Sequence, residues 1–473
     1  AVAEGADANL DAVMERGIAL IRGDADPQQE RLREQVQRCA LVVDALLGTG
    51  VTGPLRGGLP ELLATVRAEI AARRRAARTP APLRNPAVPQ APAEPALPLV
   101  VAVDVPSGLD SDTGAIDERA LAADLTVTLA HPKRGLYAFP GAAYVGELVV
   151  ADIGIAPTLA DDLADEVADA AAVAALLPQR PAAAHKGTFG RALIVAGSTH
   201  YVGAACLAAQ GASRVGAGLV TLAVPEGIYP LVAAKVTEPT FLVLPHDMGA
   251  LVPEAMRVLT PRLGEYEALL VGPGLGRDPK TGTLVAELVG RRARPRRSIG
   301  FTPEAERRAE PVALPPTVID ADALNALAEL DGWWEGLGGP AILTPHPGEM
   351  ARLMRRSTEE IQRDRLGAAR EAARQWGQVV VLKGAYTVVA TPEGRVTVIP
   401  FANAALATAG TGDVLAGAIV GLLAQGLSPR DAAVCGAYLH GLAADLWARQ
   451  GARAGMVAGD LLPLLPHALA ALA

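Results

Sequence analysis

The sequence contains little cysteine, few aromatic residues and no long apolar segment. Of its 473 residues, 3 are cysteine and 3% are aromatic. Cys39, Cys206 and Cys435 are far apart and show no C-x-x-C spacing, so the sequence indicates neither a disulfide framework nor a zinc site. We therefore expect a protein of the reducing cytoplasm.

Membrane insertion and general nucleic-acid binding have no support in the sequence. The longest apolar runs, such as residues 41–47, stop far short of the roughly 20 residues that cross a bilayer. Lys+Arg 43 against Asp+Glu 51 gives a net charge of −8, which leaves no large basic surface. We expect a small-molecule substrate. Because an alanine-rich chain with few aromatic anchors can associate through flat helical faces, we also expect a homo-oligomer.

Lysine is scarce, and arginine supplies most of the positive charge. Because guanidinium does not replace a compact ammonium at every site, each lysine marks a position to inspect. The lysines are Lys133, Lys186, Lys235, Lys280 and Lys383.

The chain is too long for one ordinary domain, and its pattern is that of an α/β protein. Short runs of Val, Leu and Ile alternate with alanine-rich stretches, as in a mostly parallel sheet covered by helices. We expect a first domain over 1–156, a linker over 157–184 that forms one helix with a tail, and a second domain over 185–473. The expected strands are 40–44, 99–104, 125–129, 147–153, 192–196, 219–224, 268–271, 317–319, 341–343 and 378–382, with helices at 61–78 and 203–214.

Two stretches are expected to be surface loops. Residues 79–98 carry seven prolines, a density that no helix or sheet interior tolerates. Residues 290–312 are rich in Arg, Pro and Glu, and the interspersed acids indicate a solvated loop and not a nucleic-acid patch.

The strongest local signal is a glycine-rich loop that ends in Gly410-Thr411-Gly412-Asp413, followed by an apolar helical stretch. Free N–H groups at such a helix start form an anion hole suited to a transferring phosphoryl group. Asp413 could accept a proton from a substrate hydroxyl. Alternatively, it is an ordinary aspartate in a first helical turn, favoured by the helix dipole.

Several polar residues follow directly after expected strands. Lys383 could reach nucleotide phosphates, although a hairpin also explains Lys383-Gly384. His346 and Glu349 could touch substrate or a water-coordinated Mg²⁺, or form a rigid turn. Neither the glycine loop nor the Lys383 segment matches the P-loop pattern. The segments 272–276 and 320–325 also follow strands, where a tight turn and a helix N-cap are the alternatives.

In the first third, two aspartates end expected strands. Asp44 and Asp104, with the Ser107 hydroxyl, offer oxygen ligands to a hard cation, and the alternative is that they are two solvated loop acids. A formal G-x-G-x-x-G ends at Gly53. It is not a dinucleotide fingerprint, because Pro54 follows and no helix opens there.

Together these motifs resemble the bifunctional NAD(P)H-hydrate repair enzymes. In that family an NAD(P)HX epimerase domain precedes an ADP- or ATP-dependent (6S)-NAD(P)HX dehydratase of the ribokinase-like fold. The dehydratase likeness covers roughly 185–473. It rests on His185-Lys-Gly187, Gly197-Ser198, Gly203-Ala-Ala205, Gly216-Ala-Gly218, Gly272-Pro-Gly-Leu-Gly276, Asp320-Ala-Asp-Ala-Leu-Asn325, Thr344-Pro-His-Pro-Gly-Glu349, Lys383-Gly-Ala385 and Gly410-Thr-Gly-Asp413.

The resemblance implies the residues of the dehydratase site. Substrate would face Asp413, the implied catalytic base, together with Gly274, His346, Pro347, Gly348, Glu349, Met350, Ala351 and Arg352. The nucleotide would lie against Lys383, Gly384, Ala385, Tyr386, Thr387, Asn403, Ala404, Ala405, Leu406, Ala407, Thr408, Ala409, Gly410, Thr411 and Gly412. The implied cofactor is ADP or ATP with Mg²⁺. The implied chemistry is phosphorylation of the hydrate hydroxyl, then elimination of phosphate to restore NADH or NADPH.

The first 155 residues resemble the epimerase, as a partial Rossmann-like domain. The likeness rests on Asp44-Ala-Leu-Leu-Gly-Thr-Gly50, Asp104-Val-Pro-Ser-Gly-Leu-Asp110 and His131-Pro-Lys133-Arg-Gly135. It implies that Asp44 and Ser107 bind K⁺ and that Asp104 is the acid/base that interconverts the R and S hydrates. The implied substrate contacts are Gly48, Thr49, Gly50, Val51, Thr52, Gly53, Pro54 and Asp104.

One epimerase motif is not found in the sequence. The family's Asn-Asn-Gly-Gly-Asp-Gly loop for phosphate and K⁺ would precede Ala1, so we expect this domain to be N-terminally incomplete. Either the segment was left out or the domain is degenerate, and the absent Met favours omission.

Two other functions stay open on sequence alone. One is a ribokinase-like kinase for a small alcohol, whose product keeps its phosphate. The other is a non-catalytic protein that binds a dinucleotide or a partner.

Overall fold

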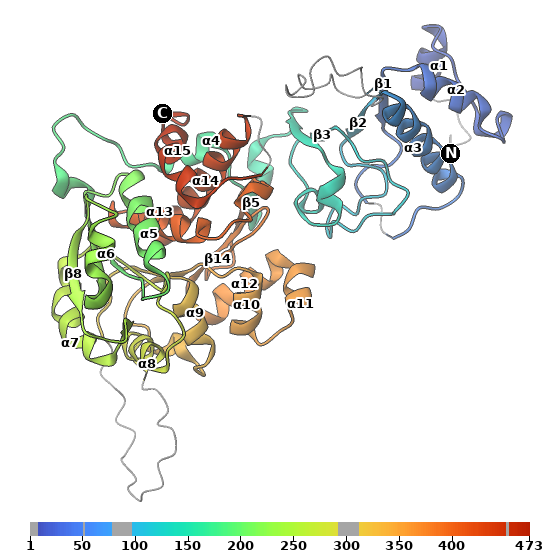
Figure 1. Cartoon of the computed structure of the whole chain (residues 1–473). Coiled ribbons are helices and arrows are strands. Elements are labelled where there is room, and N and C mark those ends of the chain that lie inside the picture. The colour runs from blue at the N-terminus through green and yellow to red at the C-terminus, as the bar shows by residue number, and fades with distance from the viewer. Residues whose placement is uncertain (1–7, 51–52, 78–96, 292–311, 451–453) are drawn as a thin grey trace, which may run out of the picture. The chain divides into compact units, whose positions relative to one another are not determined.

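A computed structural model describes residues 8–50, 53–77, 97–291, 312–450 and 454–473. The chain divides into two compact units, Ala1–Asp161 and Asp162–Ala473, each with its own sheet (Figure 1). Most of the two expected loops, and the predicted contacts Val51 and Thr52, lie outside the described residues. Within the described residues, no helix combines the length and apolarity needed to cross a membrane.

Unit 1 is built on a parallel four-stranded sheet in the order β1-β2-β3-β4. Val100 and Ala102 of β2 pack with Leu63, Val66 and Ile70 of α3 in one apolar cluster. Asp44 ends β1 and Asp104 follows β2, so both lie at the carboxyl edge of this sheet. The bounds are α1 Ala8–Glu15, α2 Glu30–Arg38, β1 Leu41–Asp44, α3 Leu59–Ala77, β2 Leu99–Val103, β3 Leu125–Leu129 and β4 Glu147–Ala151.

Unit 2 holds a ten-stranded sheet in the order β5-β16-β15-β14-β13-β12-β11-β6-β7-β8. The pairs β14·β15 and β15·β16 are antiparallel and all others are parallel. A small β9·β10 hairpin stands apart. The bounds are β5 Asp165–Val167, β6 Arg191–Val195, β7 Leu219–Pro225, β8 Thr240–Leu244, β9 His246–Asp247, β10 Ala250–Leu251, β11 Ala268–Val271, β12 Thr317–Ile319, β13 Ala341–Leu343, β14 Val379–Leu382, β15 Val388–Ala390 and β16 Val396–Val398.

Both faces of this sheet are buried, which explains its continuous apolar strands. Alternate side chains point to opposite faces, so Ile194 and Leu270 join one core cluster while Leu193 and Leu269 join another. The first cluster includes helices α5, α13, α14 and α15, and the second α8, α9, α10 and α12. The bounds are α4 Ala170–Leu176, α5 Val202–Arg214, α6 Tyr229–Ala233, α7 Met256–Leu259, α8 Pro279–Leu288, α9 Ala321–Ala328, α10 Pro347–Met354, α11 Thr358–Arg363, α12 Arg365–Trp376, α13 Thr411–Ala424, α14 Pro429–Ala448 and α15 Ala458–Ala470.

These sheets agree with the expected mostly parallel α/β class, and all ten expected strands are present within two residues of their bounds. The segment 157–184 differs from the linker expected there. The expected helix is present as α4, but its Val173 is fully buried, and the segment also contains β5, which pairs with β16. The sequence did not reveal β5 because two of its three residues are acidic.

Candidate functional site

The carboxyl edge of the ten-stranded sheet gathers the polar residues that follow its strands. Ser198 comes after β6, Gly272–Gly276 after β11, Asp320 after β12 and Lys383 after β14. Parallel strands end at the same edge, so segments far apart in sequence meet there. The motifs after β11, β12, β13 and β14 therefore lie in one region of the fold.

A cavity of about 770 Å³ opens at this edge. Gly274 and Asp413, both expected to face substrate, line it together with Ala409 and Gly410 of the glycine loop. A side chain at Gly274 would collide with the cavity wall, because its Cβ would lie 2.7 Å from the Cβ atoms of Ala204 and Tyr201. The other lining residues are Ser198, Thr199, His200, Asp247, Met248, Gly249, Ala250, Leu275, Gly276, Arg277, Asp278 and Asp322.

Asp413 lies in the first turn of α13 with its carboxylate at the cavity. Within the described residues, no other group donates a hydrogen bond to that carboxylate. Burial, together with the nearby charge of Asp320, raises the pKa of Asp413 to about 7, against the opposing effect of Lys383. Asp413 can therefore exchange a proton near neutral pH, as a general base must.

The start of α13 has unbonded N–H groups, as the expected anion hole would require. Gly410 adopts a left-handed conformation with φ of 90°, which glycine allows at low cost. The N–H groups of Thr411 and Gly412 have no partner in the part of the chain that the structure describes. Thr411 Oγ1 fixes the loop by donating to the carbonyl oxygens of Leu406, at 3.0 Å, and Thr408, at 2.9 Å.

Lys383 lies beside this loop, close to two carboxylates. Its Nζ lies 2.7 Å from Oδ1 of Asp320 and 3.8 Å from Oε2 of Glu349. A Cβ built on Gly412 would lie 3.5 Å from the same Nζ. Burial opposes the charge on Lys383, yet the carboxylates of Asp320 and Glu349 raise its pKa above the usual value.

The segment Lys383–Thr387 connects the antiparallel strands β14 and β15, so the hairpin interpretation is also correct. Thr387 Oγ1 closes the turn with a 2.9 Å hydrogen bond to the carbonyl of Gly384. The guanidinium of Arg365 donates to the carbonyl oxygens of Leu382, at 3.0 Å, and Lys383, at 3.3 Å. Burial lowers the pKa of Arg365 to about 10, which still leaves it charged at neutral pH.

His346 and Glu349 form the N-terminal cap of α10. His346 Nδ1 accepts from the N–H groups of Gly348 and Glu349, while Glu349 Oε2 accepts from His346 N–H at 2.8 Å. Burial and the charge of Lys383 lower the pKa of His346, so its imidazole is neutral at pH 7. Arg352 donates to Oδ1 of Asn325 at 3.0 Å. None of the His346–Arg352 residues is among those lining the cavity within the described structure.

In unit 1, Asp104 is held by a lysine. Lys133 Nζ donates to the Asp104 carboxylate, to Thr128 Oγ1 at 3.0 Å and to the Leu129 carbonyl at 2.9 Å. Burial acts to raise the pKa of Asp104, but the hydrogen bonds from Lys133 and Leu129 N–H outweigh it and keep the pKa below its usual value. A Cβ at Gly48 would lie 3.8 Å from Asp104 Oδ2, which places the expected substrate loop beside this carboxylate.

Asp44 and Ser107, the expected cation ligands, are buried together. Ser107 donates through Oγ at 2.5 Å and through N–H at 2.9 Å to the two oxygens of Asp44, and Leu47 N–H donates to Ser107 Oγ at 3.0 Å. In the described part of unit 1 no basic side chain pairs with Asp44. A buried carboxylate without a countercharge is a suitable ligand for a small cation.

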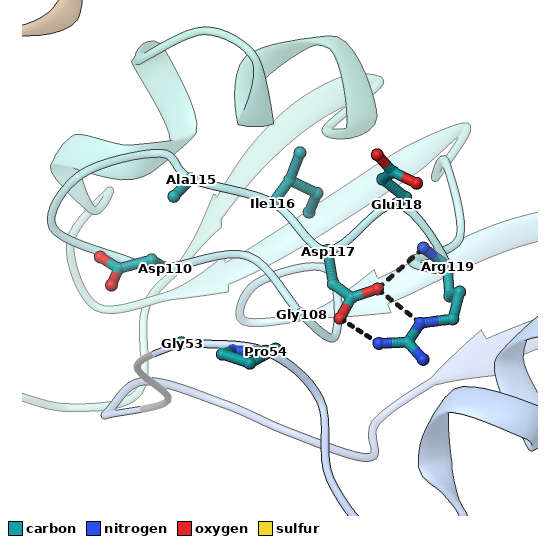
Figure 2. Close-up of a pocket in the computed structure, with 9 residues that line it drawn as sticks. All are labelled: Gly53, Pro54, Gly108, Asp110, Ala115, Ile116, Asp117, Glu118 and Arg119. Carbon is teal, nitrogen blue, oxygen red and sulfur yellow. Dashed lines mark hydrogen bonds and ion pairs between the residues drawn. The ribbon is translucent and has the colours of Figure 1, made fainter.

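A second cavity, of about 580 Å³, lies near this site (Figure 2). Gly53 and Pro54 of the expected substrate loop line it, on the side opposite Ala115 and Ile116. Asp104 is not among the described residues that line it. The other lining residues are Gly108, Asp110, Asp117, Glu118 and Arg119.

The roles of two site residues were not predicted from the sequence. Asp320 was expected only as part of a motif after a strand, with a helix N-cap as the alternative, and no N–H of α9 bonds to its side chain. Lys133 was noted only as a motif residue, although it contacts Asp104. The scarcity of lysine was the available signal, since two of the five lysines make these contacts, Lys133 with Asp104 and Lys383 with Asp320.

Two sequence families match the chain. The family described as NAD(P)H-hydrate dehydratase matches residues 192–467, and the family described as YjeF-related protein N-terminus matches residues 3–135. The first match falls within unit 2 and the second within unit 1.

Full-length relatives match both units. The bifunctional NAD(P)H-hydrate repair enzyme Nnr of Moorella thermoacetica is 42% identical over 464 residues, which cover 98% of this chain and 78% of the relative. The enzyme of the same name from Escherichia coli is 35% identical over 428 residues, 90% of this chain and 70% of the relative.

A solved structure resembles the larger part of the chain. It is the ADP/ATP-dependent NAD(P)H-hydrate dehydratase from Bacillus subtilis, co-crystallized with ATP/Mg²⁺. Its TM-score is 0.53 at 32% sequence identity, and the match covers 65% of this chain and 99% of that chain. Sequence and structural comparisons thus find the same kind of protein.

Proposed function

This chain belongs to the family of bifunctional NAD(P)H-hydrate repair enzymes, and from that premise we propose how its two units divide the work. Unit 2 dehydrates (6S)-NAD(P)HX to NAD(P)H with ADP or ATP as phosphoryl donor. Unit 1 carries the epimerase fold and interconverts the (6R) and (6S) hydrates. The observation that carries the proposal is Asp413, a carboxylate with a pKa of about 7 at the mouth of a helix-start anion hole.

In the dehydratase reaction Asp413 takes the proton of the hydrate hydroxyl. The freed oxygen attacks the terminal phosphorus of the nucleotide, and the bond from that phosphorus to its bridging oxygen breaks. The free N–H groups of Thr411 and Gly412 stabilise the charge on the moving phosphoryl group. In the second step the C–O bond to the phosphate breaks, the neighbouring carbon loses a proton, and the dihydronicotinamide ring is restored. Phosphate leaves far more readily than hydroxide, which is the purpose of the first step.

The nucleotide lies against Lys383–Thr387 and the loop Asn403–Gly412. Support comes from the position of both segments beside α13 and from the Lys383 ammonium next to Gly412. Asn403 is itself fixed by its side chain, which donates to Asp445 at 3.1 Å and accepts from Ala405 N–H. A fixed loop positions phosphoryl donor and acceptor with little ordering cost on binding.

The hydrate occupies the cavity that Gly274 and Asp413 share. The family likeness also implies contacts from His346 and Arg352 of α10, but neither residue lines this cavity in the described structure. The absence of a side chain at Gly274 lets this part of the cavity wall pack closely against Ala204 and Tyr201.

Mg²⁺ would come with the nucleotide. In the described residues no group of three or more His, Cys, Asp or Glu side chains could hold a metal ion. Mg²⁺ in proteins is commonly held by nucleotide phosphates and one or two carboxylates, and Glu349 is the carboxylate nearest to Lys383 after Asp320. When bound, Mg²⁺ would neutralise phosphate charge.

In unit 1, Asp104 is the acid/base of epimerisation and residues 48–54 contact substrate. The hydrogen bonds from Lys133 and Leu129 hold Asp104 in its ionised form. Asp44 and Ser107 would hold K⁺, because both present hard oxygens and the buried charge of Asp44 has no countercharge among the described residues. K⁺ would supply positive charge near the substrate phosphate.

The test is a hydrate assay on the purified chain. NADHX or NADPHX is incubated with ADP or ATP, and the near-ultraviolet absorbance of the dihydronicotinamide is followed together with nucleotide consumption. We expect one NAD(P)H for each nucleotide consumed, and no turnover by Asp413→Asn. The control Asp331→Asn, an exposed aspartate paired with Arg355, should behave as wild type.

Two outcomes would contradict this proposal. Nucleotide consumption without NAD(P)H would indicate a kinase whose product keeps its phosphate, whereas binding of hydrate without turnover would indicate a binding protein. A second arm uses the (6R) hydrate, corrected for spontaneous interconversion, with and without K⁺. Turnover that exceeds the spontaneous rate and depends on K⁺ supports the role of unit 1.

A further inference from the structure

A buried aspartate with no part in the proposed chemistry lies at the centre of the dehydratase site. The side chain of Asp320 is 1% exposed. Its Oδ1 accepts two hydrogen bonds of 2.7 Å, one from Lys383 Nζ and one from Thr344 Oγ1. The three residues follow the neighbouring strands β12, β13 and β14, so the sheet itself sets this contact.

The geometry is not that of a helix cap. Asp320 occupies the N-cap position of α9, where aspartate ordinarily accepts an N–H from the first turn. Here it makes no such bond and uses its carboxylate on Lys383. The protein thus gives up a local cap in favour of a long-range ion pair.

The ion pair determines where the Lys383 ammonium lies. Lys383 pairs with Asp320 and lies 3.8 Å from Glu349, and no ion pair within 4 Å joins it to Asp413 in the described structure. The ammonium nevertheless stands against the glycine loop, as its 3.5 Å distance from a Cβ built on Gly412 shows. It is close enough to meet a phosphoryl group at the loop while leaving Asp413 unpaired.

We propose that Asp320 is a positioning residue of the dehydratase centre, which holds the Lys383 ammonium at the glycine loop and away from Asp413. The inference rests on the proposed function and deepens it. Without Asp320, Lys383 would turn to the remaining carboxylates, Asp413 among them. A base that is paired with an ammonium holds its negative charge more firmly and is a weaker acceptor of the substrate proton.

The surrounding charges all bear on Asp413. Asp320, from the end of β12, and Asp322, from α9, raise its pKa, and Lys383, from the end of β14, lowers it. Glu349 of α10 lies near Lys383, and the buried His440 of α14 is neutral at pH 7, with a pKa of about 4. Loss of the Asp320 charge and closer approach of Lys383 would act in the same direction, toward a lower pKa of Asp413.

The test compares Asp320→Asn with wild type over a range of pH. We expect kcat at neutral pH to fall by about 10-fold or more, because the ammonium is misplaced. We also expect the acid limb of kcat/KM to move to lower pH by about one unit. Asp320→Glu, which keeps the charge, should leave that limb closer to its wild-type position. Thr344→Val is the matched control, since it removes the other hydrogen bond to Asp320 and keeps all charges. It should lower activity equally at every pH.

An infrared titration makes the test independent of turnover. The carboxylic-acid band of protonated Asp413 is identified as the band lost in Asp413→Asn. In folded Asp320→Asn this band should disappear at lower pH than in wild type, and a band that titrates at unchanged pH would overturn the inference. If Asp320→Asn does not fold, Lys383→Met is introduced both into the wild type and into Asp320→Glu, and the two resulting proteins are compared. Removing the ammonium should then abolish any difference between the two, and a persisting shift would contradict the role of Lys383. Absence of hydrate turnover in wild type would contradict the proposed function alone.

Discussion

The imidazole Nε2 of His440 lies 2.9 Å from the carbonyl oxygen of Thr411, two residues before Asp413. His440 comes from α14 and is buried, and burial lowers its pKa to about 4. A carbonyl only accepts hydrogen bonds, so the neutral ring must donate from Nε2. The contact links α14 to the first turn of α13, where the free N–H groups of the proposed anion hole are found.

Replacing His440 should therefore loosen that turn. We expect His440→Leu to lower kcat about 10-fold, because the N–H groups and Asp413 lose their fixed direction. His440→Gln can still donate to Thr411 and should recover part of the loss. The measurement is steady-state dehydration, with the exposed His467→Leu as control, and equal kcat values for the Leu and Gln variants would contradict the hydrogen-bonding role.

The pH dependence of dehydration should report Asp413. A base works only when deprotonated, so kcat/KM should rise with pH through about 7, the pKa of Asp413. The check is a pH profile with substrate below KM. A flat profile across neutral pH would show that Asp413 is not the titrating base.

The Asp413 carboxyl should lower the stability of unit 2 at high pH. Its folded pKa is raised above the usual 3.8, so the protonated form favours the folded state, and this contribution is lost as pH rises through about 7. Asp413→Asn should thus raise the melting temperature of unit 2 at pH 8 by a few degrees, and the difference should vanish well below pH 4. Calorimetry at both pH values measures it, and destabilisation at pH 8 would contradict the prediction.

The Lys133–Asp104 pair should stabilise unit 1 at neutral pH and lose this effect in acid, which is the reverse of the pH dependence expected for Asp413. The folded pKa of Asp104 is lowered, so the stabilisation is present above the usual pKa and is lost as pH falls through the folded value. Lys133→Met should destabilise unit 1 at neutral pH by about 1–3 kcal/mol, because a half-buried carboxylate loses its charged donor. Urea unfolding measures this, with Lys280→Met at the exposed pair with Asp247 as control. An equal loss in acid would point to packing instead of charge.

Gly274 should not tolerate a side chain. Its φ is 63°, and an added Cβ would lie 2.7 Å from Ala204 and Tyr201. Gly274→Ala should raise KM for the hydrate about 10-fold or more and destabilise unit 2 by about 1–3 kcal/mol. Gly203→Ala is the matched control, since nothing lies within 4 Å of its added Cβ and alanine favours a helix. Wild-type kinetics in Gly274→Ala would show that the substrate does not approach this wall.

Much of the fold could be predicted from apolar runs. Strands such as β11 and β14 are buried on both faces and consist of uninterrupted Val, Leu and Ala, so their signal is strong. The antiparallel β15 and β16 were missed although the equally short β12 and β13 were predicted, so strand length alone does not explain the difference. Short or acidic strands are defined by their neighbours in the sheet and not by their own composition.

The candidate site, like the fold, could be predicted only in part from the sequence. That the segments after β12, β13 and β14 would meet follows from parallel strand order, which the alternation of strands and helices predicts. That Lys383 would pair with Asp320, 63 residues earlier, depends on the register of three strands and on side-chain reach. Sequence spacing carries no such information, and the same holds for Lys133 and Asp104.

The short strand β5 has a practical consequence for where unit 2 can be cut. Asp165 and Glu166 form ion pairs with Arg370 and Arg430, and the strand covers the outer edge of β16. A shortened protein that starts at His185 would leave the backbone of β16 open to a strand from another molecule, a common route to aggregation. A shortened protein that starts at Asp162 keeps β5, which covers this edge of the sheet.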